Sequence, residues 1–227
     1  FCVKSKDLET AAMSICGNLH EKTILISLLN GVNNAKRLQK VYPRLTVLNG
    51  CIYVSASIIK PGTVKQVGGA GNVYVGSEQG NTADYVQLVS LMRAADIKII
   101  LSENIVADVW NKYIFICSWA TISSVHMLPI GDILASEKLK QQWIGLIEEL
   151  KLVASSLGVY YDPNITNLCI ERAEKIPYEN KTSMQIDIEQ GKTPELDVFT
   201  AYVVEQAREL SVPVPFHEDA LRKLMNK

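Results

Sequence analysis

The sequence predicts an α/β region followed by an all-helical region, with the division near Ser102. Up to residue 102, short apolar runs alternate with amphipathic helical patterns and with glycine-containing turn signals, as in layered α/β proteins. After residue 102, strand signals nearly vanish and the helical period continues to the end of the chain. We therefore expect two domains, 1–102 and 103–227.

The first elements alternate between strand and helix. Residues 1–3 read as the end of a strand, and residues 7–19 as an amphipathic helix. The nearly continuous apolar run at 23–29 is typical of a parallel strand that is covered on both faces. A short helix over 34–41 continues this order, which indicates an α/β sheet.

Residues 47–76 are expected to form an antiparallel meander. Three β-like runs cover 51–59, 63–67 and 72–75. The turn signals KPG (60–62) and GGAG (68–71) separate them. Glycine and proline supply the backbone angles that tight turns require, so we place a turn at each signal.

Helical periodicity dominates the remainder of the chain. A helix is expected over 84–95, and a closing strand over 98–101. The helices expected beyond them cover 103–125, 131–157, 165–174, 183–190, 195–210 and 215–225.

Composition narrows the function classes. The chain has 227 residues, 48% hydrophobic content and a formal net charge of −1. It therefore lacks the excess of basic residues that is typical of a nucleic-acid binder, and we expect no nucleic-acid partner. No apolar run approaches the roughly 20 residues that span a bilayer, so we expect no membrane partner.

The cysteines and histidines show no spacing that is typical of a metal site or a disulfide framework. Most cysteines lie in apolar surroundings, which indicates free buried thiols in the reducing cytoplasm. The three histidines are far apart in the sequence, and no C-x-x-C pair occurs, so no metal is expected. The cysteines are Cys2, Cys16, Cys51, Cys117 and Cys169.

The run Gly69-Ala70-Gly71 is a near miss to the dinucleotide fingerprint G-x-G-x-x-G. That fingerprint must follow a strand and open a helix, so that backbone amides and the helix dipole meet the pyrophosphate. Here the glycines lie between two β-like runs, and Tyr74 replaces the last glycine. This context favours a turn over a phosphate loop. Because a dinucleotide sheet carries its glycine loop in its first βα unit, we expect about two such units upstream and a fragment that is inactive alone.

Lys112 precedes a strongly apolar helical stretch, YIFIC (113–117). One interpretation is an exposed i,i+4 pair with Asp108, which is worth about 0.2–0.5 kcal/mol. The other is a functional ammonium, because a buried lysine requires a partner or a substrate anion. The residues alone leave both interpretations open.

Two helix-start signals flank a polar segment near the C-terminus. The run TPE (193–195) resembles an N-cap, a proline at the first helical position and an acid in the first turn. Thr182 and Gln185 have the spacing of a capping box. Two capped helices in this order would also gather Ser183 and Glu195 near one crevice, so the structural and functional interpretations are compatible.

Lys4 and the Asn30-Gly31 pair each follow a predicted strand. Asn-Gly is a common turn signal, and the pair has that simpler explanation. At the carboxyl edge of a dinucleotide-type sheet, however, these residues would lie where ligands bind.

Four motifs, in order and spacing, resemble the ketopantoate reductase (2-dehydropantoate 2-reductase) family. They are VKSKD (3–7), LLNG (28–31), WNK (110–112) and the segment that starts with NKTSM (180–184) and ends with ELD (195–197). The resemblance implies the C-terminal part of a Rossmann-type NADP-binding domain, without its glycine loop. A helical substrate and dimerisation domain like that of 6-phosphogluconate dehydrogenase would follow.

The resemblance also implies a reaction: NADPH-dependent reduction of ketopantoate to pantoate, in pantothenate and coenzyme A biosynthesis. Lys112 would be the catalytic acid, and Glu195 would bind the hydroxyl end of the substrate. The remaining roles implied are substrate binding by Asn180 and Ser183, and contact with the nicotinamide end of NADP(H) by Lys4, Asn30 and Gly31. The resemblance is also compatible with a homodimer.

One departure from the family concerns the substrate. Many relatives carry asparagines one and two turns after the catalytic lysine, and here these positions are Ile116 and Ala120. A related reductase of another 2-oxo acid therefore stays open as an alternative. A non-catalytic helical interaction module is a second alternative, since apolar helices such as 144–157 would serve it equally well.

Overall fold

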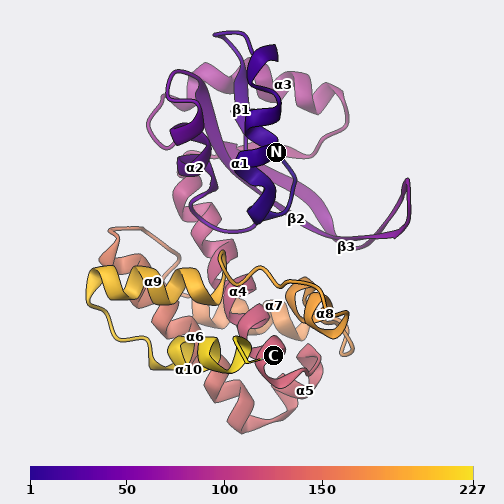
Figure 1. Ribbon diagram of the computed structural model, residues 1–227, viewed down its shortest axis with the longest axis vertical. Helices are drawn as coiled ribbons and strands as arrows, with labels where there is room; N and C mark the ends of the chain where they lie inside the picture. The colour runs from indigo at the N-terminus through magenta and orange to yellow at the C-terminus, as the bar shows by residue number, and fades with distance from the viewer. Residues whose placement is uncertain (227) are drawn as a thin grey trace. The chain divides into compact units, whose positions relative to one another are not determined.

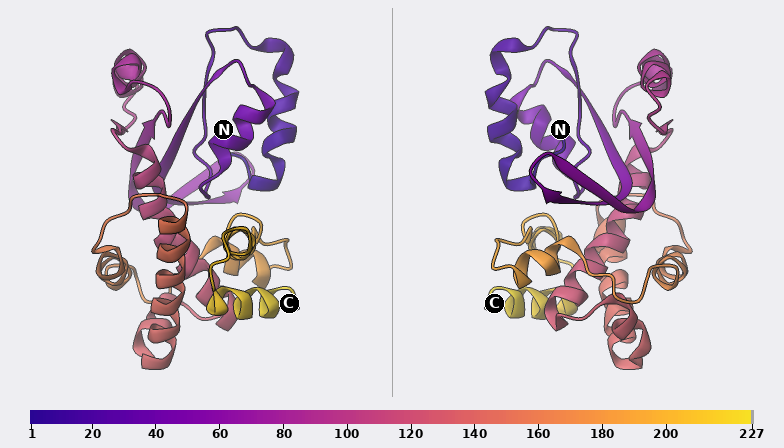
Figure 2. Two further views of the ribbon diagram at one scale, coloured as in Figure 1. Left: turned by 90° about the vertical axis from the view of Figure 1, so that its left-hand side faces the viewer. Right: turned by 90° about the vertical axis from the view of Figure 1, so that its right-hand side faces the viewer.

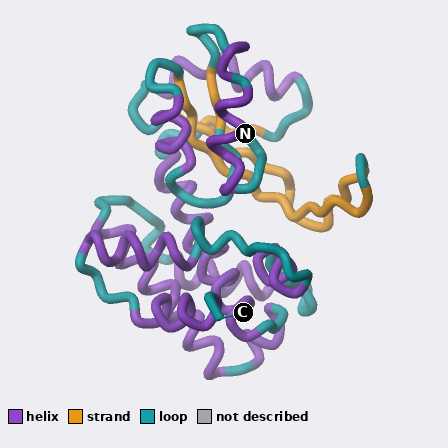
Figure 3. The backbone as a smooth tube through the Cα atoms, viewed as in Figure 1, coloured by secondary structure: helices purple, strands orange, loops and turns teal. Residues whose placement is uncertain are grey.

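The computed structural model describes residues 1–226 and divides the chain into two compact units. The first unit is Phe1–Val109, and the second starts at Trp110. This division falls inside helix α4 (Ile105–His126). Strands are confined to the first unit among the described residues, as the colouring of Figure 3 shows.

The first unit is built on a four-stranded mixed sheet with the order β1-β2-β3-β4 (Figure 1). Strand β1 pairs with β2 in parallel, β2 with β3 in antiparallel, and β3 with β4 in parallel. The strands are β1 (Ile24–Ile26), β2 (Thr46–Lys60), β3 (Thr63–Gly76) and β4 (Ile99–Leu101).

Helices cover both faces of this sheet, with α1 and α2 on one side and α3 on the other (Figure 2). One core cluster joins Leu8, Leu25 and Leu38 on the side of α1 and α2. The other joins Val75 and Val89 on the side of α3. These elements are the 3-10 turn η1 (Ser5–Asp7), α1 (Leu8–Ser14), η2 (Cys16–Asn18), α2 (Asn34–Val41), η3 (Thr82–Tyr85) and α3 (Val86–Ala94). The α/β part of the prediction is thus confirmed.

The predicted meander is wrong: β2 and β3 form one long hairpin whose outer part extends as a two-stranded arm (Figure 3). The turn at Pro61-Gly62 is present, and Gly62 has a φ of +75°. The glycine run 68–71, however, lies inside β3. A Cβ atom on Gly69 would lie 2.5 Å from the carbonyl oxygen of Tyr53. The glycines therefore permit a close, irregular strand pairing instead of a turn.

The second unit is helical, as predicted, and its centre is α4. This helix is buried on nearly every side, and Trp143 of α6 donates a hydrogen bond from Nε1 to Ser118 Oγ at 3.0 Å. The other helices are α5 (Ile130–Ala135), α6 (Glu137–Ser156), α7 (Ile165–Glu174), α8 (Ser183–Glu189), α9 (Thr200–Leu210) and α10 (Pro215–Leu224). No helix in the described part of the chain is long and apolar enough to cross a membrane.

Two helix predictions in this unit are wrong. The single helix expected over 131–157 is divided into α5 and α6, because Ser136 caps a new helix by accepting a hydrogen bond from the amide of Leu139. The helix expected from 195 starts only at Thr200, because Phe199 has a non-helical backbone. The expected helices over 165–174 and 215–225 are confirmed.

Candidate active site

Lys112 lies in the buried part of α4, and the residue is only 8% exposed. Its neighbours in the sequence, Trp110 and Tyr113, are 4% and 1% exposed, so this turn of α4 is buried. An ammonium in such a place costs free energy unless an anion or a hydrogen-bond acceptor accompanies it. Because Lys112 is buried, the interpretation that it forms an ion pair on an exposed helix surface is wrong.

Tyr113, the neighbour of Lys112, fixes the segment that carries Glu195. Its hydroxyl donates a hydrogen bond to the carbonyl of Val198 at 2.8 Å, and its ring stacks on that of Phe199 at 6.3 Å between centroids. Burial raises the pKa of Tyr113 well above its ordinary value, so the hydroxyl keeps its proton and remains a donor. Glu195 lies three residues before Val198, in the segment that Tyr113 holds.

A backbone turn follows Glu195 in the sequence. The carbonyl of Leu196 accepts hydrogen bonds from the amides of Phe199 at 3.2 Å and Ala201 at 2.9 Å. Glu195 thus precedes a closed turn and stands five residues before α9, where it is half-buried. Its explanation as the first turn of a helix is wrong.

A second buried contact joins α4 to the start of α9. The hydroxyls of Thr121 and Thr200 lie 2.8 Å apart. Both residues are fully buried, so this pair satisfies two polar groups that would otherwise be costly. It fixes the end of the segment that contains Glu195.

A third contact joins α4 to the segment of Asn180 and Ser183. The hydroxyls of Ser123 and Thr182 lie 2.9 Å apart, and Thr182 Oγ1 accepts a hydrogen bond from the amide of Gln185 at 3.2 Å. The N-cap predicted at Thr182 is thus confirmed. The side chain of Gln185 donates instead to Glu189. Ser183, the first residue of α8, is exposed.

The backbone around Asn180 is held by the start of α5. The carbonyl of Asn180 accepts the amide of Ile130 at 3.1 Å, and the carbonyl of Tyr178 accepts that of Gly131 at 3.0 Å. Amides in the first turn of a helix have no partner within the helix, so the carbonyls of this segment satisfy them. The ring of Tyr178 covers Gly131.

Lys112, Asn180, Ser183 and Glu195 therefore belong to one unit, in segments that three side-chain contacts attach to a single helix. Sequence reasoning missed the residues that make these attachments. The available signal was a series of hydroxyl side chains within an otherwise apolar helix, at Ser118, Thr121, Ser123 and Ser124. Buried hydroxyls require hydrogen-bond partners, and here several of the partners lie in the two functional segments.

Lys4, Asn30 and Gly31 all belong to the first unit, where they lie at one edge of the sheet. The nitrogen of Phe1 donates to the carbonyl of Ile26 at 2.7 Å, and the amide of Leu28 donates to the carbonyl of Phe1 at 3.0 Å. This is the hydrogen-bond pattern of a parallel pairing. The residues that follow, up to Lys4 and Asn30, therefore extend toward the same edge.

The Asn30-Gly31 pair adopts a conformation that requires glycine. Gly31 has a φ of +103°, which residues with a side chain rarely adopt. The carbonyl of Asn30 accepts a hydrogen bond from Asn34 Nδ2 at 2.8 Å. Lys4 is exposed, and Asn30 is half-buried.

Other reactive groups are arranged for structural roles. Burial raises the pKa of Cys117 to about 12, so its thiol stays protonated and is a poor nucleophile at neutral pH. Within residues 1–226, no group of three or more His, Cys, Asp or Glu side chains is arranged to hold a metal ion.

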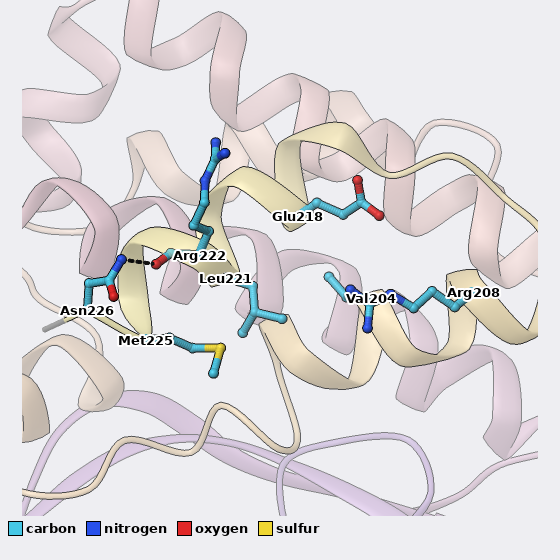
Figure 4. A pocket seen from close by; sticks show the side chains of 7 residues that line it. All are labelled: Val204, Arg208, Glu218, Leu221, Arg222, Met225 and Asn226. Atoms are coloured by element: carbon cyan, nitrogen blue, oxygen red, sulfur yellow. Dashed lines mark hydrogen bonds between the residues drawn. The ribbon is translucent and has the colours of Figure 1, made fainter.

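A cavity of about 310 Å³ lies at the C-terminal end of the second unit (Figure 4). Its lining comes from α9 and α10 and from the two residues after α10, and it includes none of the candidate residues. These lining residues are Val204, Arg208, Glu218, Leu221, Arg222, Met225 and Asn226.

The chain matches two protein-family models. Residues 104–227 match the model described as "Ketopantoate reductase PanE/ApbA C terminal", and residues 1–80 match "Ketopantoate reductase PanE/ApbA". The first match covers the helices from α4 onward, and the second covers α1, α2 and strands β1 to β3.

Individual proteins resemble the chain over nearly its whole length. It is 27% identical over 207 residues to the uncharacterized oxidoreductase YkpB of Bacillus subtilis, across 91% of this chain and 68% of YkpB. It is 25% identical over 218 residues to the 2-dehydropantoate 2-reductase of Halobacterium salinarum, across 94% of this chain and 70% of that enzyme. The crystal structure of a PanE/ApbA family ketopantoate reductase from Ralstonia eutropha has a TM-score of 0.90 at 26% identity, across 100% of this chain and 74% of the other.

Proposed function

Because this chain belongs to the PanE/ApbA ketopantoate reductase family, we propose that it is an NADPH-dependent oxidoreductase that reduces ketopantoate to pantoate. This reaction would serve pantothenate and coenzyme A biosynthesis in the cytoplasm, and we propose a homodimer as the working assembly. One observation supports the reaction most strongly. The segments that carry Asn180, Ser183 and Glu195 are attached to the same helix that carries the buried Lys112.

Lys112 is proposed as the general acid. NADPH, when bound, supplies the hydride that adds to the 2-oxo carbon. The ammonium of Lys112 stabilises the negative charge that develops on the carbonyl oxygen and then donates a proton from Nζ to that oxygen. The interaction is stronger at this buried position than it would be in water.

The remaining polar residues would recognise the substrate. The carboxylate of Glu195 accepts a hydrogen bond from the hydroxyl group of ketopantoate, and Asn180 and Ser183 hold the acid through their amide and hydroxyl groups. A hydrogen bond to a charged group is more selective than one to a neutral group. Glu195 is therefore the residue that should distinguish ketopantoate from an analogue without the hydroxyl.

The sheet edge in the first unit fits the nicotinamide end of a dinucleotide. Lys4 and Asn30 follow adjacent parallel segments, and ligands of such sheets bind at their carboxyl edge. Gly31 has a positive φ there, which a residue with a side chain would rarely adopt. The choice of NADP(H) over NAD(H) rests on the family.

A second candidate substrate class is a 2-oxo acid with an apolar side chain. Residues four and seven positions after Lys112 share its face of α4, and these are Ile116 and Trp119. Both are half-buried. A substrate that lies along this face would contact aliphatic and aromatic surface, which favours apolar over hydroxylated side chains.

A pair of matched substrates tests the proposal. Ketopantoate and 3,3-dimethyl-2-oxobutanoate differ only in the hydroxyl, so NADPH oxidation is measured with each, for the protein expressed from its complete reading frame and for its Glu195→Gln variant. We expect E195Q to lower kcat/KM for ketopantoate by roughly 10- to 100-fold, the loss of a hydrogen bond to a charged group. The analogue should be little affected. A wild type that prefers the analogue would favour the second candidate, and no turnover with either would refute both.

A further inference from the structure

A single guanidinium joins the two loops that carry Lys4 and Asn30. Arg37, on α2, donates from Nε and Nη2 to the two carboxylate oxygens of Glu9, each at 2.7 Å. It also donates from Nη1 to Ser5 Oγ at 2.6 Å and from Nη2 to the Ser5 carbonyl at 2.8 Å. Ser5 follows Lys4 directly and is 1% exposed.

The same guanidinium reaches the second loop through Asn34. Arg37 Nη1 lies 3.4 Å from Asn34 Oδ1, and Asn34 Nδ2 donates to the carbonyl of Asn30 at 2.8 Å. Asn34 is 2% exposed. The chain of contacts thus runs from the residue after Lys4, through Arg37 and Asn34, to Asn30.

The geometry of this network matters more than its contribution to stability. The side chains of Arg37 and Glu9 are 21% and 42% exposed, and ion pairs at such partly exposed sites contribute little to folding. A guanidinium, however, presents its donors in a rigid planar fork, which fixes the direction of each partner. A lysine in place of Arg37 would keep the positive charge but would lack this planar arrangement of donors.

We infer that Arg37 is a positioning residue, which sets Lys4 and Asn30 at the spacing that the nicotinamide end of the cofactor requires. The inference rests on the proposed function, because it takes both residues to contact the cofactor. Arg37 itself is held by Ser5, Glu9 and Asn34 and acts only through the loops that it joins.

The test compares Arg37→Lys and Arg37→Met with wild type in the protein expressed from its complete reading frame. Arg222→Met is the matched control, since Arg222 forms an exposed ion pair with Asp219 on α10. The measurements are the KM for NADPH, the KM for the 2-oxo acid, kcat and Tm. Kd for NADPH is measured separately by fluorescence.

We expect both Arg37 variants to raise KM and Kd for NADPH by roughly tenfold or more, as expected for misplaced binding groups. At saturating NADPH, kcat and the KM for the 2-oxo acid should stay near wild type, and R37K should keep the Tm of R222M. Asn34→Ala, which cuts only the branch to Asn30, should give a smaller rise.

Two results would overturn the inference. One is an R37K variant with wild-type KM and Kd for NADPH, since the charge alone would then suffice. The other is that in both Arg37 variants kcat and Tm fall and both KM values rise together, which describes a structural role. A wild type that does not bind NADPH would refute the proposed function itself, before any variant is compared.

Discussion

The hydroxyl of Tyr113 donates a hydrogen bond to the carbonyl of Val198 at 2.8 Å. This bond links the helix turn of Lys112 to the segment of Glu195, although Tyr113 and Val198 are 85 positions apart in the sequence. One buried contact thus joins the two segments that carry Lys112 and Glu195, which are proposed to bind the same substrate.

Removing that contact should affect both folding and substrate binding. In Tyr113→Phe the buried carbonyl of Val198 loses the hydroxyl donor, which costs about 1–3 kcal/mol of unfolding free energy. We also expect a higher KM for ketopantoate, because the segment of Glu195 is less well fixed. Urea denaturation and steady-state kinetics check the two effects. Tyr202→Phe is the control, and equal behaviour of the two variants would count against the role of Tyr113.

Lys112→Ala should separate catalysis from folding. Loss of a general acid lowers kcat by roughly 10²- to 10⁴-fold. The buried ammonium costs free energy to enclose, so its removal should leave the fold intact by circular dichroism and NADPH binding unchanged. Lys138→Ala, at an exposed position of α6, is the control. A K112A variant with near-normal turnover would remove Lys112 from the mechanism.

Gly131→Ala should disturb the segment of Asn180. A Cβ atom at this position would lie 2.2 Å from the ring of Tyr178, whose hydroxyl donates to Asp132 at 2.6 Å. Overpacking of this kind costs about 1–3 kcal/mol. We expect a lower Tm and a raised KM for the 2-oxo acid. Gly17→Ala, where nothing lies within 4 Å, is the matched control and should be nearly neutral.

His217 should make stability depend on pH. Its Nδ1 lies 2.7 Å from Glu149 Oε2, and that carboxylate also accepts the amides of Phe216 at 2.7 Å and His217 at 2.9 Å. Burial lowers the pKa of His217, and it outweighs the opposing effect of Glu149. The folded state thus favours the neutral ring.

Because this pKa is lowered, the unfolding free energy should decrease in acid. The stability that the neutral ring contributes is present above the unfolded pKa of about 6.5 and is lost as pH falls toward the folded pKa. Urea unfolding at pH 7.5 and pH 5 should show a decline that His217→Gln reduces. An identical decline in the variant would mean that groups other than His217 cause the loss of stability at pH 5.

Local sequence signals predicted the elements that depend on local chemistry. The helix over 34–41, the N-cap at Thr182 and the proline that opens α10 are all present. Each depends on residues within one or two turns of each other, which a sequence displays directly.

The failures have a different cause, because a backbone contact that the local pattern does not display overrides it. The glycines 68–71 look like a turn, but they allow β3 to approach β2 at Tyr53. The TPE run looks like a helix start, but the carbonyl of Leu196 accepts two amides and closes a turn first. Neither partner can be identified from periodicity.

The sequence indicates which residues could form the site, but it does not indicate the contacts that hold them in place. Lys112, Glu195 and Asn30 were selected on residue type and on resemblance to a family, and their roles stay predictions. The attachments through Tyr113, Thr121 and Ser123 depend on side chains that meet across the fold. Arg37 carried no sequence signal, because its partners outside α2, Glu9 and Ser5, lie 28 and 32 positions away in the sequence.

One measurement tests the central claim most directly: NADPH oxidation with ketopantoate as the only acceptor, by the protein expressed from its complete reading frame. We predict turnover that saturates with ketopantoate and yields pantoate in equal amount to the NADPH consumed. No oxidation with ketopantoate or with any other 2-oxo acid would contradict the account and favour a non-catalytic helical interaction module.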